Sequence, residues 1–108
     1  MKLENIQAQM RKGILEYCVL AIINKEEIYA SDIISKLKEA DLLIVEGTLY
    51  PLLTRLKNAG FLAYNWIESD QGPPRKYYTT TEEGQTFLEE LDKTWKILSH
   101  SVQQLTNQ

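Results

Sequence analysis

The fold of this chain is decided by residues 46–60, which read EGTLYPLLTRLKNAG. Four leucines in this stretch recur at helical spacing and share one face: Leu49, Leu52, Leu53 and Leu56. Gly60 follows the pattern directly, at the position where helices often end on a glycine. We therefore expect an amphipathic helix from Glu46 to Ala59 that packs its leucines on a core.

A second amphipathic helix is expected just before this one. Ser31 is a candidate N-cap, and three aliphatic residues form the core face behind it: Ile33, Ile34 and Leu37. This helix should end near Asp41, which leaves only a short link from Asp41 to Val45. Two amphipathic helices with a link of this length fit a helix-turn-helix.

The N-terminal part of the chain is expected to form one helix from Ile6 to Asn24. Its apolar residues make two stripes, one of Ile6, Met10, Ile14, Tyr17 and Ala21 and the other of Leu15, Cys18, Val19 and Ile22. A helix that is apolar on two sides is buried on two sides.

Downstream of Gly60 the pattern changes from helix to strand. Residues Phe61–Ser69 and Lys76–Thr81 favour strands, and the segment between them, Asp70–Pro74, is rich in turn-forming residues. We expect a β-hairpin with a longer loop. Three helices followed by a hairpin are the order of a winged helix-turn-helix, so the predicted fold class is mainly α with a small β-hairpin.

A last helix, capped by Thr81, is expected from Glu82 to Leu105. Apolar residues recur along it at three- and four-residue intervals: Leu88, Leu91, Trp95, Leu98, Val102 and Leu105. So narrow a seam is typical of a helix that pairs with another helix. We expect residues 81–108 to be the C-terminal dimerisation helix of a homodimer, and residues 1–80, with the N-terminal helix, to be the winged helix-turn-helix domain. The alternative is that the seam packs only on its own domain.

The formal net charge of the chain is −3, whereas domains that bind nucleic acid are usually basic. All of the excess negative charge lies after residue 80, where two basic residues stand against five acidic ones. No acidic residue occurs from Gly47 to Ile67. Because salt screens surface fields over roughly 8 to 10 Å, a locally basic surface is compatible with an acidic total.

Other functional classes find little support in the sequence. The single Cys18 and the single His100 supply neither a set of metal ligands nor a catalytic constellation, so we expect no metal, no cofactor and no enzymatic activity. Cys18 is interpreted as a buried small hydrophobe and His100 as a solvated surface residue. The longest apolar run, Tyr17–Ile23, is too short to cross a membrane, so a cytoplasmic protein without a membrane partner is expected.

The helix from Glu46 to Ala59 carries side chains that suit a DNA groove on the faces away from its leucines. They include Thr48, Tyr50, Arg55 and Lys57. Such side chains contact phosphates or base edges, and none of these four repels a polyanion. Arg75 and Lys76 lie at the return of the hairpin, where a wing tip meets the minor groove or the backbone. These residues favour duplex DNA as the partner, although an ordinary solvated face explains the helix composition equally well.

Several motifs follow one another in a defined order: Lys12–Glu16, Glu46–Pro51, Leu53 with Arg55–Leu56, Gly60–Leu62, Gly72–Tyr78 and Thr81–Gly84. Together they resemble the PadR family of transcriptional regulators, over nearly the whole chain. The resemblance implies a winged helix, a C-terminal dimerisation helix and, usually, repression that a small molecule relieves. It also implies that an operator is contacted by Thr48, Tyr50, Arg55 and Lys76, with Tyr29, Lys57 and Arg75 as weaker candidates.

Three positions depart from the usual pattern of that family. Val45 stands where a polar residue such as serine is frequent, Ala30 where glycine is common, and Thr80 where leucine is usual. Val45 removes a candidate N-cap and a phosphate contact. This substitution bears on operator affinity more than on the fold.

Some regulators of this family have a tryptophan that matches Trp95 and lines a dimer cavity for flat aromatic effectors. The resemblance therefore implies an effector site at Trp95, lined also by Met10, Ile14, Tyr17 and Cys18; simple packing of the dimer core is the alternative. The expected function is a sequence-specific DNA-binding regulator, a repressor released by a small aromatic effector. The alternative function is a winged-helix protein–protein adaptor that has lost DNA binding.

Overall fold

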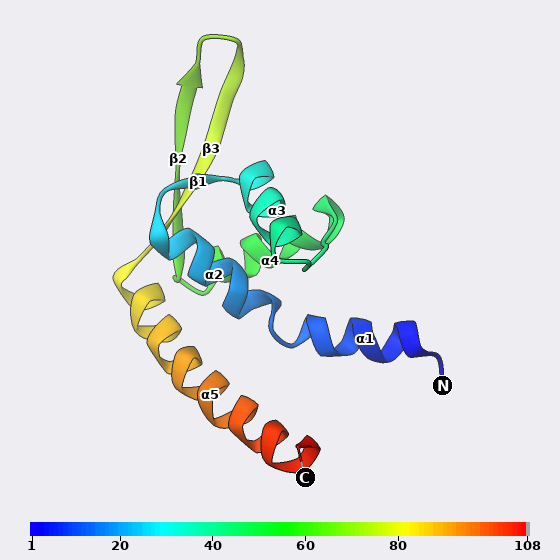
Figure 1. The fold of residues 1–108 in the computed structure, drawn as a ribbon. Coiled ribbons are helices and arrows are strands. Elements are labelled where there is room, and N and C mark those ends of the chain that lie inside the picture. Colours follow the sequence, from blue (N-terminus) through cyan, green and yellow to red (C-terminus); the bar gives the residue numbers. More distant parts are fainter. Residues whose placement is uncertain (108) are drawn as a thin grey trace.

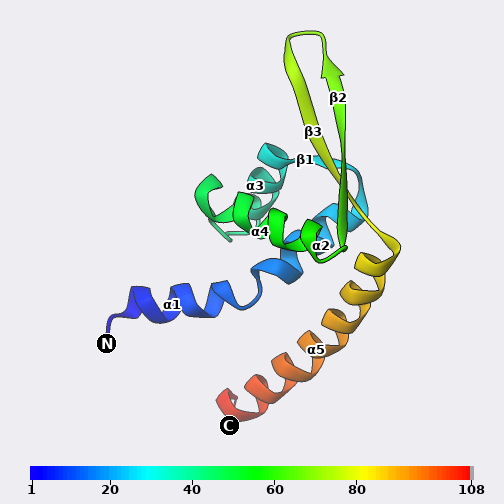
Figure 2. The same ribbon diagram turned by 180° about the vertical axis from the view of Figure 1, so that it is seen from behind.

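The computed structural model describes residues 1–107. Its elements, in chain order, are α1 (Leu3–Lys12), α2 (Leu15–Lys25), β1 (Ile28–Tyr29), α3 (Ala30–Glu39), α4 (Glu46–Asn58), β2 (Leu62–Ser69), β3 (Gly72–Thr80) and α5 (Glu82–Thr106). The β2–β3 hairpin projects from one end of the molecule, while α1 and the far half of α5 extend towards the other (Figures 1 and 2). The predicted class, mainly α with a small β-hairpin in a winged helix-turn-helix, is confirmed.

The single helix expected from Ile6 to Asn24 is wrong, because the chain breaks at Gly13 and Ile14 into α1 and α2. Glycine weakens a helix interior by about 1 kcal/mol relative to alanine, and Ile14 has φ −110° and ψ −1°, outside regular helix. The break lets α2 enter the core while α1 turns away from it. As a result α2 buries Val19, Leu20 and Ile23, whereas α1 buries no residue.

The helix-turn-helix consists of α3 and α4. The expected N-cap Ser31 is wrong: α3 begins at Ala30, because Tyr29 at the N-cap position already pairs with β3 as part of β1. Helix α4 confirms the expected start at Glu46, and Gly60 after it has φ 88°, the left-handed conformation expected for a C-terminal glycine. Val45 at the N-cap of α4 makes no side-chain cap.

The sheet has the strand order β1-β3-β2, and all pairs are antiparallel. The expected long loop over Asp70–Pro74 is wrong, because β3 already begins at Gly72 and includes Pro73 and Pro74. Proline lacks the N–H that a central strand needs, but β1 pairs with β3 only at Tyr77 and Tyr78. The prolines therefore lie where β3 is still an edge strand. Strand β1, with two residues, gave no recognisable sequence signal.

Helix α5 starts where the sequence predicts. Thr81 Oγ1 accepts a hydrogen bond from the backbone N–H of Gly84 at 3.0 Å and donates one to the carbonyl of Gly60 at 2.6 Å. Gly84 is buried, and a Cβ there would overlap the carbonyl oxygen of Phe61. Glycine thus permits α5 to lie directly against the end of the helix-turn-helix.

One hydrophobic core joins α2, α3, α4, the sheet and the start of α5. Its buried residues include Leu20, Ile33, Leu49, Leu53, Leu62, Tyr78 and Leu88. The leucine face predicted for α4 is confirmed, since all four of its leucines are buried. The core therefore fixes α4 with its other faces towards solvent, which positions the surface described next.

Candidate nucleic-acid interface

The hairpin and α4 enclose a cleft with a volume of about 290 Å³, which we call the wing cleft. Its main side chains are Tyr29, Tyr50, Thr54, Trp66, Arg75 and Lys76. Tyr50 and Thr54 come from α4, Tyr29 from β1, and the remaining three from the hairpin. The fold thus brings together four residues that the sequence analysis selected at separate places: Tyr29, Tyr50, Arg75 and Lys76.

A smaller hollow of about 140 Å³ adjoins the cleft and adds Lys57 and Asn58 from α4. Lys76 lines both hollows, and no acidic residue is among the side chains lining either of them. Aromatic rings hold the cations in place: the Lys76 ammonium lies 4.1 Å and the Lys57 ammonium 5.5 Å from the centroid of Tyr64. Arg75 lies 4.9 Å from the Tyr29 ring in the same way. The charged side chains that line the two hollows are therefore all basic, even though the chain is acidic overall.

Thr48 and Arg55 lie outside the wing cleft. Both line another hollow, of about 490 Å³, between α4 and the α1–α2 junction, together with Arg11 and Lys12. The Arg55 guanidinium donates to the Glu16 carboxylate at 3.0 Å, although its side chain stays 63% exposed. Arg55 therefore also ties α4 to α2, a contact that the sequence analysis did not foresee.

The expected effector residues are only partly brought together. Met10 and Ile14 face Trp95, Leu98 and Val102 across an open hollow of about 480 Å³, which we call the α1–α5 hollow. Tyr17 and Cys18 are not among the residues that line it. Cys18 is half-buried, and burial raises the pKa of its thiol. His100 is exposed, as expected.

Tyr17 instead links α2 to α5. Its hydroxyl donates to the Asp92 carboxylate on α5 at 2.6 Å. This hydrogen bond, followed by desolvation and the nearby negative charge, raises the pKa of Tyr17 to about 12. The phenol therefore stays protonated and remains a donor at neutral pH.

The apolar seam of α5 passes from buried to exposed along the helix. Leu88 is buried in the core of its own chain and Leu91 is half-buried. Beyond them Trp95, Leu98, Val102 and Leu105 are 42%, 52%, 51% and 78% exposed. The first half of the seam thus packs on its own domain, and the second half is only partly covered by residues 1–107.

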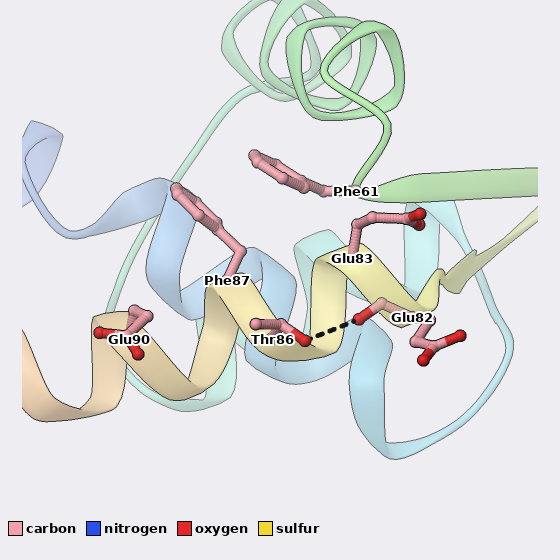
Figure 3. Close-up of a pocket in the computed structure, with 6 residues that line it drawn as sticks. All are labelled: Phe61, Glu82, Glu83, Thr86, Phe87 and Glu90. Carbon is pink, nitrogen blue, oxygen red and sulfur yellow. Dashed lines mark hydrogen bonds between the residues drawn. The ribbon is translucent and has the colours of Figure 1, made fainter.

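Another hollow, of about 510 Å³, lies at the start of α5 and was not expected from the sequence (Figure 3). Phe61 and Phe87 stack there with ring centroids 4.1 Å apart. Glu82, Glu83 and Glu90 line the same hollow, so this face repels DNA. Within residues 1–107, no cluster of three or more metal-ligating side chains occurs, and no helix is long and apolar enough to span a membrane.

Comparison with known proteins identifies the family. The model of the transcriptional regulator PadR-like family matches residues 19–90, which include α3, α4 and the hairpin. The chain belongs to the PadR family. Because members of this family are transcriptional regulators, this PadR-family protein is a regulator and not an enzyme.

Solved structures of other PadR-like proteins share the fold. A PadR-like transcription factor from Bacteroides fragilis is 60% identical, with a TM-score of 0.78, and the match covers 94% of this chain and 99% of that one. A PadR family regulator from Eggerthella lenta is 34% identical, with a TM-score of 0.87 over 95% of this chain and 90% of that one. Bacillus subtilis PadR, solved in complex with operator DNA, is 27% identical, with a TM-score of 0.67 over 72% of this chain and 46% of that one.

One residue of the wing cleft had no function assigned from the sequence. Trp66 was expected only as part of a strand, yet it lines the cleft beside Lys76, its partner across the hairpin. The alternation of side chains along a strand could have grouped Trp66 with Tyr64. It could not have shown which residues of the other strand lie opposite them.

Proposed function

We propose that this PadR-family regulator binds duplex DNA sequence-specifically through the wing cleft and the exposed faces of α4. The carrying observation is that Tyr50 of α4 and Arg75 and Lys76 of the hairpin line one cleft without an acidic side chain. A winged helix presents α4 to the major groove and the hairpin to the flanking backbone or minor groove. The complex of Bacillus subtilis PadR with operator DNA supports the same mode for this chain.

The individual residues take different parts in this proposal. Tyr50 lines the wing cleft and Lys57 the adjoining hollow, and both would face the DNA groove; Tyr29 lines the cleft in contact with Arg75. Thr48 and Arg55, on the neighbouring face of α4, reach adjacent phosphates or bases. Arg55 does so by exchanging the Glu16 carboxylate for DNA, which its exposure permits.

The proposal includes a homodimer in which residues 81–108 dimerise and residues 1–80 bind DNA. Its support is the half of α5 from Trp95 to Leu105, whose apolar seam is largely exposed in the single chain. Met10 of α1, 72% exposed, belongs to the same end of the molecule. A second copy would cover these surfaces, since small symmetric dimers are the commonest closed assemblies. Two recognition helices can then meet successive turns of an operator.

The regulator would act as a repressor that a flat aromatic molecule releases. Support comes from the α1–α5 hollow, in which Trp95 and apolar side chains of α1 line a space of about 480 Å³, the size of a small-molecule site. A ligand there releases DNA only if it prefers a dimer geometry in which the two α4 helices no longer match the groove spacing. The proposal includes a cytoplasmic location, because the chromosome that carries the operator lies there.

Selection of bound sites from random duplex DNA tests the DNA-binding proposal. The full-length protein should enrich a two-part sequence, and the enriched duplex then serves as the probe for variants. Tyr50→Ala should lower affinity for this duplex more than for random duplex. Lys76→Ala should lower both and flatten the salt dependence, because phosphate contacts release counterions.

The matched control for Lys76→Ala is Lys93→Ala, which removes a lysine of α5 that forms an ion pair with Glu90 on the same helix. Its affinity should equal that of the unaltered protein. If no duplex is enriched, and neither Tyr50→Ala nor Lys76→Ala binds random duplex more weakly than the control, the protein is a winged-helix adaptor instead. The effector proposal is tested with flat aromatic compounds. They should quench the fluorescence of Trp95 in a Trp66→Phe variant, and they should lower operator affinity. Quenching without a loss of affinity contradicts the release mechanism.

A further inference from the structure

Trp66 is the most exposed aromatic residue among residues 1–107, with 63% of its surface accessible. Tryptophan is among the largest apolar side chains and is highly buried on average. It lies in β2, in the hairpin that projects from the body (Figure 1). An indole that is exposed on the projecting hairpin favours a role in binding.

Contacts within the hairpin fix the orientation of the indole. Trp66 pairs with Lys76 across the hairpin, and the next pair on the same face is Tyr64 with Tyr78. The rings of Trp66 and Tyr64 meet edge to face at 6.3 Å, and the Lys76 ammonium lies 5.5 Å from the indole and 4.1 Å from the Tyr64 ring. We call Tyr64, Trp66 and Lys76 the aromatic platform.

The platform faces the same space as the proposed recognition helix. Trp66 and Lys76 line the wing cleft together with Tyr50 and Thr54 of α4. Tyr64 and Lys76 line the adjoining hollow with Lys57. The indole is thus presented where a DNA strand entering the cleft would run.

Neither the core nor a second copy explains the exposed indole. Leu62 and Tyr78 are buried on the core side of the hairpin base, whereas the Trp66–Lys76 pair lies two pairs further out than the pair that contains Tyr78. The surfaces proposed for dimerisation, on α1 and α5, lie at the opposite end of the molecule from the wing (Figure 2). The remaining occupant that suits a cationic, aromatic surface is the nucleic acid itself.

We propose that Trp66 is a DNA-contacting residue that packs its indole on the sugar and base edges beside the wing. The inference rests on the proposed function and adds a contact whose strength does not depend on salt. Aromatic rings bind bases and sugars through stacking and apolar contact, which displace no counterions, unlike the contacts of Lys57, Arg75 and Lys76. The indole N–H can in addition donate to a phosphate oxygen.

Affinity measured over a range of salt concentrations tests this contact, with the duplex selected by the unaltered full-length protein as the probe. Trp66→Ala should weaken binding about tenfold per half-site, or about 100-fold for a dimer, with an unchanged slope of affinity against salt. Trp66→Phe should lose less, because a ring remains. The matched control is Ile67→Ala, which removes the neighbouring exposed side chain on the other face of β2 and should change affinity less than about threefold.

A second measurement leaves the hairpin unaltered. In a Trp95→Phe variant only Trp66 emits as a tryptophan, and saturating selected duplex should reduce its quenching by acrylamide. Unchanged quenching, or equal losses of affinity for Trp66→Ala and Ile67→Ala, overturns the inference while DNA binding itself stands. A protein that enriches no duplex refutes the proposed function and this inference together.

Discussion

Replacing Tyr17 by phenylalanine removes one hydroxyl that joins α2 to α5. In the structure this hydroxyl donates to Asp92 at 2.6 Å, and no other side-chain hydrogen bond between α2 and α5 is found in residues 1–107. Phenylalanine keeps the ring and its packing. The variant therefore isolates the hydrogen bond.

The expected cost follows from the charge and the partial exposure of the pair. A hydrogen bond to a charged group contributes about 1.5 to 3 kcal/mol when shielded from water. Tyr17 is only half-buried, so solvent screening reduces this to about 1 kcal/mol. For a domain of this size, such a loss lowers the melting temperature by about 4 °C.

The loss should depend on pH in a defined direction. The pKa of Tyr17 is raised from 10.0 to about 12 in the folded protein, so folding favours the protonated phenol. The stabilisation is complete below pH 10 and is lost as the pH rises from 10 to 12. The difference in melting temperature between the unaltered protein and Tyr17→Phe should be constant from pH 7 to 9 and close above pH 10.

Thermal melts at one fixed protein concentration measure this difference, since association also shifts the melting temperature. Tyr77→Phe is the matched control, because the Tyr77 ring contacts Tyr29 while its hydroxyl has no hydrogen bond in the part of the chain described. It should change the melting temperature by less than about 2 °C. If Tyr17→Phe costs no more than Tyr77→Phe, the Tyr17–Asp92 bond does not stabilise the fold.

Three further substitutions have defined outcomes. Gly84→Ala should destabilise the protein by about 1 to 3 kcal/mol in chemical denaturation, because its Cβ overlaps the Phe61 carbonyl. Thr80→Val should stabilise the protein by about 1 kcal/mol, because the buried Thr80 hydroxyl has no hydrogen-bond partner among residues 1–107. A loss of stability would show that this hydroxyl forms a hydrogen bond in solution. Leu98→Ala should raise the dimer dissociation constant roughly 30-fold, as measured by sedimentation. The reason is that Leu98 is half-exposed in the single chain, and its loss from each of the two protomers removes about 1 kcal/mol of apolar burial. His100→Ala should leave the dissociation constant unchanged.

The helix-turn-helix and the start of α5 could be predicted from the sequence because their signals are local. The leucine spacing of α4, the left-handed Gly60 and the Thr81 cap each depend on residues within one or two turns. The cationic residues of α4 could also be named, because residues 47–67 contain no acidic residue, and those of the wing, because they lie at the expected return of the hairpin. That they share one cleft could not.

Tertiary contacts decided the remaining features, because partners distant in the chain leave no periodic pattern. Pairing of Tyr29 with Tyr77 moved the start of α3, and docking of α2 into the core turned a weak helix position at Gly13 into a break. For the same reason three contacts could not be predicted from the sequence: the ion pair of Arg55 with Glu16, the hydrogen bond of Tyr17 with Asp92, and the pairing of Trp66 with Lys76. Local propensity therefore determined which elements form, and long-range packing determined where they break and which side chains meet.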